Sequence, residues 1–213
     1  MAQETTLFEQ PIVMIDFETT GLSPAVGDRI TEVAALRIVG GVVTERYVTL
    51  INCGLRIPSF VTALTGISQS MLNSAPPVAR VLPQLLDFIG DDVLAAHNAS
   101  FDSKFLLAES LRQGLLPRHR GLICSLKLAR RMLPGQVSYK LGRLASALNI
   151  TYRGAAHRAE ADAEVSTRLL LHIGGALRDQ YRCKSIAPSL LEAINRQSAA
   201  RVPDFLGRSF TAP

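Results

Sequence analysis

The feature that most constrains the fold is a run of four apolar residues that leads directly into two acids. Residues 12–15 are Ile-Val-Met-Ile, and Asp16, Phe17 and Glu18 follow before a Thr-Thr-Gly turn. A short apolar run closed by a turn predicts a strand buried on both faces. Alternate strand residues share a face, so Asp16 and Glu18 point the same way and Phe17 points into the opposite layer. Because two unpaired buried carboxylates repel each other, the pair predicts a divalent cation held by oxygen ligands.

The length, composition and net charge of the chain indicate which class of protein it belongs to. The chain has 213 residues, of which 47% are hydrophobic and 19% charged, which suits one globular domain with room for an appendage. Its net charge of +5 favours an anionic partner such as nucleic acid, although an inert basic surface shows the same excess. The polar N-terminus is no signal peptide, and no apolar run approaches the ~20 residues of a membrane span. We therefore expect a cytoplasmic protein without membrane contact, whose Cys53, Cys124 and Cys183 are free thiols.

The remaining hydrophobic patterns switch between strands and helices. Two β-rich runs, residues 29–39 and 42–51, are joined by Gly40-Gly41, which predicts an antiparallel hairpin beside the first strand. Short strands are expected at residues 93–96 and 121–124. Helices are expected over residues 77–89, 101–113, 125–132, 138–148 and 187–197.

A further acid stands at the start of one predicted helix. Residues 97–100, His-Asn-Ala-Ser, form a turn with capping residues between the strand at 93–96 and the next helix. Asp102 therefore lies in the first helical turn, where the helix dipole favours an ionised carboxylate. Asp102 is either a helix stabiliser or an acid placed at the strand end for chemistry.

The third chemical stretch runs from His157 to Glu164. Asp162 shares a helical face with apolar residues three and seven positions later, so it should face the body of the protein. His157 would lie roughly 140° away around the same helix, so it can reach the site only from the preceding loop. An exposed loop histidine and a satisfied polar contact are the plain alternatives for these two residues. Glu160 and Glu164 are expected on the solvated face.

Basic residues gather on the helices at 125–132 and 138–148, where they either contact phosphates or form a solvated face. They are Lys127, Arg130, Arg131, Lys140 and Arg143. Residues 201–210 form an apolar-basic tail that either packs back on the domain or binds a partner.

The chain resembles the DEDDh 3′–5′ exonucleases in three sequence blocks. In order, the blocks read Asp16-Phe-Glu18-Thr-Thr-Gly-Leu, His97-Asn-Ala-Ser-Phe-Asp102 and His157-Arg-Ala-Glu-Ala-Asp162-Ala. Their order, residue types and spacings are most similar to the proofreading epsilon subunit of bacterial DNA polymerase III. Residues 65–67, 128–134 and 138–141 also look like family segments, so the resemblance covers roughly residues 10–178.

The resemblance implies a fold and a catalytic centre. The fold would be α/β and ribonuclease-H-like, a mixed central sheet with an antiparallel hairpin and helices on both faces. Asp16 would bridge two Mg²⁺ or Mn²⁺ ions, with Glu18 and Asp162 completing the tighter site. Asp102 would serve the second ion, and His157 would be the general base that activates the attacking water.

The resemblance also implies how a nucleic-acid 3′ end would be bound. The residues expected to contact the terminal nucleotide are Thr19, Gly21 and Leu22, with Thr65, Ile67, Asn98 and Phe101 as further candidates. His97 is expected to be structural or to touch substrate rather than to ligate metal. The product would be a nucleoside 5′-monophosphate.

The domain organisation and the partners follow from the extent of the match. Residues 1–178 would form the exonuclease domain and residues 179–213 a C-terminal extension. That extension has no clear clamp- or polymerase-binding motif of the epsilon type, which favours a separate repair nuclease or a proofreader acting in trans. A polymerase partner bound through the tail and a homodimer stay open. One rival function is an RNA-trimming or dual-substrate exonuclease, although Glu18-Thr-Thr-Gly favours the DNA-type branch. The other is a catalytically silent nucleic-acid-binding module.

Overall fold

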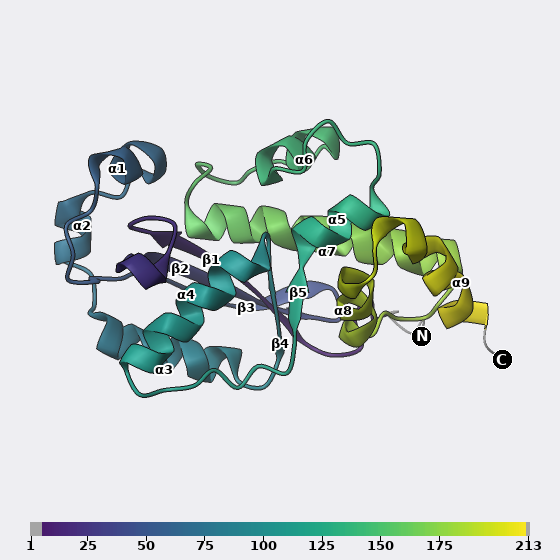
Figure 1. The fold of residues 1–213 in the computed structure, drawn as a ribbon, viewed down its shortest axis with the longest axis horizontal. Helices are drawn as coiled ribbons and strands as arrows, with labels where there is room; N and C mark the ends of the chain where they lie inside the picture. Colours follow the sequence, from purple (N-terminus) through teal and green to yellow (C-terminus); the bar gives the residue numbers. More distant parts are fainter. Residues whose placement is uncertain (1–5, 212–213) are drawn as a thin grey trace.

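A computed structural model describes residues 6–211 and is built around one five-stranded sheet of order β3-β2-β1-β4-β5 (Figure 1). The strands are β1 (Ile12–Thr19), β2 (Ile30–Val39), β3 (Val42–Leu50), β4 (Val93–Ala96) and β5 (Leu122–Cys124). β2 runs antiparallel to its neighbours β1 and β3, whereas β4 pairs parallel with β1 and β5 pairs parallel with β4. Gly40 and Gly41, with φ of 63° and 101°, close the predicted hairpin in a conformation that other residues rarely adopt. The predicted mixed sheet is confirmed.

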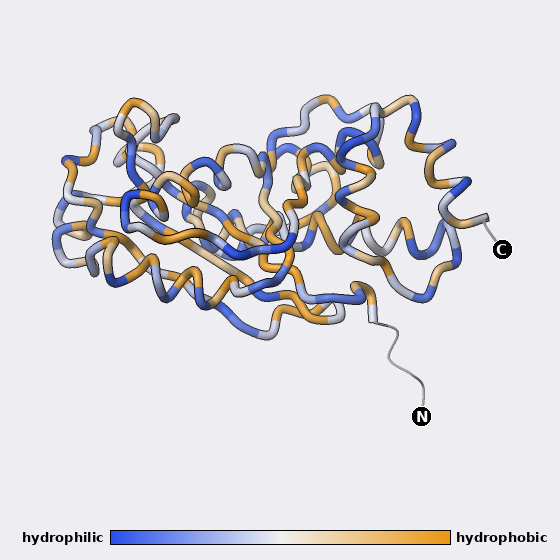
Figure 2. The backbone as a smooth tube through the Cα atoms, turned by 60° about the horizontal axis from the view of Figure 1, so that its bottom comes forward, coloured by the Kyte–Doolittle hydropathy of each residue, from blue (hydrophilic) through white to orange (hydrophobic). Residues whose placement is uncertain are grey.

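Two hydrophobic cores lie on the two faces of the sheet because β1 alternates. Ile12 and Met14 pack into one core, whereas Val13, Ile15 and Phe17 pack into the other. The helices α5 (Ser125–Met132), α6 (Leu141–Ala147) and α7 (Ala159–Tyr181) contribute to the first core. The helices α3 (Val78–Ile89) and α4 (Ala99–Arg112) contribute to the second. Figure 2 shows how apolar and polar residues alternate along such helices, which is why each one buries a single side.

Two short helices extend beyond the end of the sheet at the left of Figure 1. They are α1 (Ser59–Thr65) and α2 (Gln69–Asn73). Ile57, Val61, Ile67 and Leu72 form a small core of their own between them. The helices therefore stand as a separate wall beside the carboxyl end of β1.

Two helices begin more than one residue away from the predicted position. The helix expected from residue 138 begins only at Leu141, because Lys140 is extended (φ −64°, ψ 140°). The segment before it is instead held by a half-buried histidine, as described below. The helix expected from Phe101 begins at Ala99, since Asn98 takes a left-handed conformation (φ 70°) that turns the chain directly into the helix.

The C-terminal segment packs back on the domain. Its helices are α8 (Pro188–Arg196) and α9 (Val202–Thr211), whose apolar side chains join the same core as α7. The Glu192 carboxylate accepts the N–H of Leu122 (2.6 Å), and the Asn195 side chain bonds both the N–H and the C=O of Cys124 (2.7 and 3.2 Å). The domain boundary expected at residue 178 falls inside α7 and stays a prediction. The three cysteines are free thiols, and none of the helices within residues 6–211 has the length and apolar character to cross a membrane.

Candidate active site

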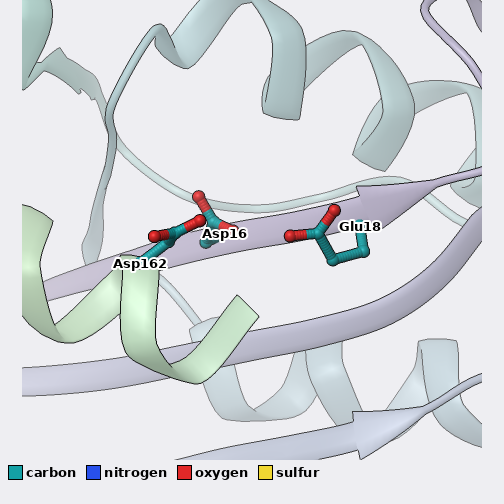
Figure 3. Close-up of side chains that lie close together, drawn as sticks. All are labelled: Asp16, Glu18 and Asp162. Carbon is teal, nitrogen blue, oxygen red and sulfur yellow. The ribbon is translucent and has the colours of Figure 1, made fainter. Parts of the chain in front are cut away.

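Three carboxylates converge where the end of β1 meets the start of α7. Asp16 and Glu18 share the face of β1 that α7 covers, and Asp162 comes from the first turns of that helix (Figure 3). One oxygen from each of the three lies within 4.8 Å of the others. The predicted sharing of a face by Asp16 and Glu18 thus brings two acids from one strand against a third from a distant segment.

A fourth acid, Asp102, reaches the same region from α4. It is 3% exposed and accepts the backbone N–H of Phe17 at 3.2 Å. Burial raises the pKa of Asp102 to about 7. Asp102 is therefore more than an exposed helix stabiliser, because its side chain is buried and its carboxylate hydrogen bonds to the backbone of β1.

Burial raises the pKa values of these acids, and repulsion between neighbouring carboxylates adds to the effect for Asp16 and Glu18. Burial raises the pKa of Asp16 well above its ordinary value, and repulsion from Asp102 and Asp162 adds to this. Burial, followed by the charges of Asp162 and Glu32, raises the pKa of Glu18 to about 8. Within the described residues, no ion pair to Lys, Arg or His neutralises Asp16, Glu18, Asp102 or Asp162. Crowded carboxylate oxygens that no ion pair neutralises fit hard divalent cations.

His157 lies in the loop directly before α7, as the helical geometry required. It is exposed and takes a left-handed backbone conformation (φ 61°). Its backbone N–H donates to Oδ2 of Asp162 at 3.2 Å. This hydrogen bond holds the loop histidine beside the helix acid, although the two residues would point in different directions if both were helical.

The acids and His157 open into one cavity of about 250 Å³. Of the residues expected to bind substrate, it is lined by Thr19, Gly21, Leu22, Thr65, Asn98 and Phe101. Ile67 does not line it, because this side chain is fully buried in the core between α1 and α2. We therefore assign Ile67 to packing and not to substrate contact.

Sequence reasoning missed several residues of this cavity. Phe60, Val61 and Leu64 line it from α1, and Phe60 is 66% exposed. An exposed phenylalanine on a short broken helix was the available signal. Tyr152, which does not line the cavity, was missed as well: burial, together with the negative charge of Asp162, raises the pKa of its hydroxyl.

His97 lines the cavity, and both of its ring nitrogens lie at hydrogen-bond distance from residues outside the cavity lining. Its Nε2 lies 3.2 Å from the Tyr139 carbonyl oxygen and its Nδ1 lies 3.0 Å from the Ser125 hydroxyl. The carbonyl can only accept, so Nε2 carries the proton and Nδ1 accepts from Ser125. Burial lowers the pKa of His97 to about 4. A neutral imidazole with both nitrogens engaged positions the segment before α6.

The sequence as a whole matches a known family model. The RNase T model, described as Exonuclease, matches residues 13–170, which include all four acids and His157. The chain belongs to this exonuclease family.

Known relatives of this chain include both short and long proteins. The DNA polymerase III subunit epsilon of Aquifex aeolicus is 33% identical over 167 residues, which are 78% of this chain and 82% of the relative. The 3′–5′ exonuclease DinG of Bacillus subtilis is 36% identical over 170 residues, 80% of this chain but 18% of the relative. The Mycobacterium tuberculosis protein MT2247 is 36% identical over 206 residues, 90% of this chain and 32% of the relative. The chain thus spans only a fraction of two of these three relatives.

Solved structures with the same fold include DNA complexes. Exonuclease X bound to 5′ overhanging duplex DNA superposes with a TM-score of 0.67 at 25% identity, covering 86% of this chain and 99% of that one. Escherichia coli exonuclease I bound to dT13 gives 0.68 at 18% identity, covering 82% and 44%. The second match shows the shared fold, a ribonuclease-H-like α/β architecture.

Of the basic residues predicted to gather on or next to α5 and α6, Arg131 has a structural role and the others lie at the surface. Arg131 donates to the backbone carbonyls of Gln197 (2.8 Å) and Lys127 (2.9 Å), so it holds the C-terminal segment. Lys127, Arg130, Lys140 and Arg143 are exposed. The prediction that Glu164 lies on a solvated face was wrong: its side chain is 14% exposed and pairs with Arg46 at 2.7 Å.

Proposed function

We propose that this chain is a metal-dependent 3′–5′ exonuclease that hydrolyses phosphodiester bonds at DNA 3′ ends and releases nucleoside 5′-monophosphates. The observation that carries the proposal is the convergence of Asp16, Glu18 and Asp162 within 4.8 Å, with Asp102 and His157 in the same cavity. The direction is supported by the relative named 3′–5′ exonuclease DinG, and the DNA substrate by the complex of exonuclease X with duplex DNA.

The four acids would hold two divalent cations, Mg²⁺ or Mn²⁺. When bound, such cations polarise the scissile phosphate, make water more acidic and stabilise the leaving oxygen. Asp16 and Glu18 are fixed by a buried strand, and Asp102 is fixed by the N–H of Phe17. The donors are therefore set in place by the fold before any ion arrives, which limits the entropy lost on binding.

His157 would take the proton from the attacking water. An imidazole is the most frequent general base in enzymes, and a candidate must lie within reach of the reacting groups. The exposed ring of His157 lines the cavity, while its backbone is tied to Asp162 at 3.2 Å. The tie to Asp162 uses the backbone of His157 and leaves its ring out of that contact.

The terminal nucleotide would lie between two walls of the cavity. Thr19, Gly21 and Leu22 follow β1, and Phe101 projects from α4. Leu22 is 79% exposed, so it can enter between the last two bases without a large rearrangement. Phe60 on α1 offers a flat apolar surface on which a base can stack.

The biological role we propose is that of a separate nuclease in repair, or of a proofreader acting in trans. The C-terminal helices support this, because α8 and α9 pack in the core of the domain. A polymerase complex, as the name of the epsilon relative implies for that protein, would need a different surface.

A matched digestion tests the proposal. A 5′-labelled single-stranded DNA and the same sequence as RNA are incubated with Mg²⁺, Mn²⁺ or chelator. The proteins compared are the wild type, Asp16→Asn and the control Asp91→Asn, since Asp91 is an exposed acid that pairs only weakly with Arg120 (3.4 Å). We expect a metal-dependent ladder that shortens from the 3′ end of DNA, at least about a hundredfold slower in Asp16→Asn and unchanged in Asp91→Asn.

Each other outcome of the digestion has a defined meaning. Comparable shortening of RNA would replace the DNA assignment by a dual or RNA-trimming function. Binding of DNA with no product under Mn²⁺ would indicate a silent binding module. Activity of Asp16→Asn above a tenth of wild type would contradict the two-metal site.

A further inference from the structure

Glu32 is a buried charge that the proposed chemistry does not use. It lies on β2 directly opposite Glu18 on β1, and it is 3% exposed. A buried carboxylate is unfavourable unless ionic and hydrogen-bond partners replace water. Each described partner of Glu32 belongs to one of two consecutive residues at the start of α7, Arg158 and Ala159.

The contact is bidentate and includes the backbone. Nη2 of Arg158 lies 2.6 Å from Oε1 of Glu32, and Nε lies 3.1 Å from Oε2. The same Oε2 accepts the backbone N–H of Ala159 at 3.0 Å. This N–H is one of the unsatisfied donors at a helix start, so Glu32 acts as a cap supplied by the sheet. The geometry fixes both the position and the rotation of the first turn of α7.

That first turn carries the proposed chemistry. His157 precedes Arg158, and Asp162 follows four residues after it. The left-handed backbone of His157 (φ 61°) is of order 1–3 kcal/mol less favourable than an ordinary conformation, so neighbouring contacts must hold it. Asp162 accepts the N–H of His157 itself, and Glu32 accepts the N–H two residues later. The chain is therefore held on both sides of the proposed base.

We infer that Glu32 and Arg158 are positioning residues that set His157 and Asp162 in their catalytic geometry. Glu32 belongs to the same sheet as Asp16 and Glu18. Its contacts therefore fix the position of the helix relative to the strand that carries these two acids. Figure 3 shows how Asp162 must project from this end of the helix toward β1 to meet them. A displacement of about 1 Å at such a site lowers rates about a hundredfold. The inference rests on the proposed exonuclease function.

The matched control is another arginine that pairs with α7. Arg46 on β3 lies 2.7 Å from Glu164 and 3.2 Å from Glu160, but the Arg46 side chain is 42% exposed and pairs with neither His157 nor Asp162. Loss of these ion pairs removes contacts of the same helix, one of them in its first turn, but leaves the hydrogen bonds of Glu32 to Arg158 and Ala159 in place. Arg46→Met and Arg158→Met therefore separate general helix anchoring from positioning of the site.

The experiment measures kcat and KM on the labelled DNA, Mn²⁺ affinity by calorimetry, and thermal unfolding. Glu32→Gln keeps the shape and one acceptor oxygen, whereas Glu32→Ala removes both. We expect kcat to fall at least tenfold in Glu32→Gln and further in Glu32→Ala, with KM within twofold of wild type. Mn²⁺ affinity should fall a few-fold, and Arg46→Met should change none of these values more than twofold. The Glu32→Gln/Arg158→Met double variant should lose little more kcat than its worse single variant, because the pair acts as one unit.

The outcomes distinguish this inference from the proposed function. A lowered melting temperature with kcat and Mn²⁺ affinity within twofold of wild type in both Glu32 variants would overturn positioning and leave a purely structural ion pair. A wild-type protein without Asp16-dependent nuclease activity would overturn the proposed function. In that case the Mn²⁺ affinity still tests the positioning inference. An unchanged affinity in a folded Glu32→Ala protein would contradict any positioning of Asp162.

Discussion

Glu18 and Glu32 lie directly opposite each other on β1 and β2, yet they differ in their partners. Glu32 is paired with the guanidinium of Arg158 at 2.6 Å, whereas Glu18 forms no ion pair with any described basic residue. The two carboxylates therefore divide the roles at this point of the sheet. Glu32 is neutralised by the chain itself, and Glu18 is left without an ion pair in a cavity where a cation can bind.

Divalent cations should stabilise the fold through the acids. We expect Mn²⁺ at a hundredfold excess over its dissociation constant to add about 2.7 kcal/mol to the free energy of unfolding. Asp16→Asn should abolish this gain, yet be at least as stable as wild type in chelator at pH 8, because it removes a buried repelling charge. Calorimetric melting of both proteins and of Asp91→Asn, with Mn²⁺ and with chelator, measures this. A chelated Asp16→Asn protein that melts well below wild type would contradict the repulsion.

Stability of the metal-free protein should fall as the pH rises. Glu18 titrates from an ordinary value of 4.5 in the unfolded chain to about 8 in the folded one, and Asp102 from 3.8 to about 7. Between these limits the folded state binds more protons, so the free energy of unfolding decreases with pH. Urea unfolding in chelator should show a decrease on the order of a few kcal/mol between pH 4.5 and 8, with a smaller slope in Glu18→Gln. A flat or rising profile would show that the acids are not held apart from solvent.

His157→Ala should separate proton transfer from metal binding. We expect kcat to fall by about 10²–10⁴-fold, the range of general base catalysis. Mn²⁺ affinity should stay within threefold, because alanine keeps the backbone N–H that binds Asp162. His172→Ala is the matched control, since His172 is exposed on α7, the helix that follows His157. A loss of Mn²⁺ affinity as large as that of Asp16→Asn would assign His157 to metal binding instead.

Phe60 should contribute to substrate binding through its ring. Stacking of a base on an aromatic side chain is worth about 1–3 kcal/mol, so Phe60→Ala should raise KM for single-stranded DNA about tenfold with little change in kcat. Phe60→Tyr keeps the ring and should restore KM. Leu111→Ala, which removes a similarly exposed apolar side chain (58%) from the far end of α4, serves as the control. Equal effects of the alanine and tyrosine variants would exclude stacking.

Asn195 should matter for stability and not for turnover. Its side chain satisfies two backbone groups of the buried Cys124, and an unpaired buried group is unfavourable by about 1–3 kcal/mol. Asn195→Ala should lower the free energy of urea unfolding by this amount, while kcat and Mn²⁺ affinity remain those of wild type. Arg196→Ala, at the exposed neighbour, should leave all three unchanged. A large loss of kcat in Asn195→Ala would connect α8 to the active site.

The strands and the acids could be predicted because their signals are local. The strand geometry of residues 12–19 determines which side chains share a face, and the structure places Phe17 in the opposite core from Ile12 and Met14. Asp162 could be assigned to the inner face of its helix from spacing alone. These predictions needed only the geometry of one element at a time.

What could not be predicted depends on partners far apart in the chain. The contact between Glu32 and Arg158 spans 126 positions, and that between Arg46 and Glu164 spans 118. Glu164 was expected in solvent because nothing near it in sequence indicates the arginine that β3 brings over it. Likewise, the late start of α6 follows from the hydrogen bond between His97 and Tyr139, which the helical periodicity of residues 138–148 cannot show.

The hydrogen bonds from α8 to β5 have a consequence for the order in which the chain folds. Until residues 188–196 leave the ribosome, the outer N–H and C=O groups of β5 have neither a strand nor a side chain to bind. An open strand edge of this kind can recruit a second nascent chain. All four acids of the site, at positions 16, 18, 102 and 162, are synthesised before this edge is closed. Completion of the nuclease domain is thereby delayed until its C-terminal helix has been made, and that helix shields the growing sheet from its neighbours.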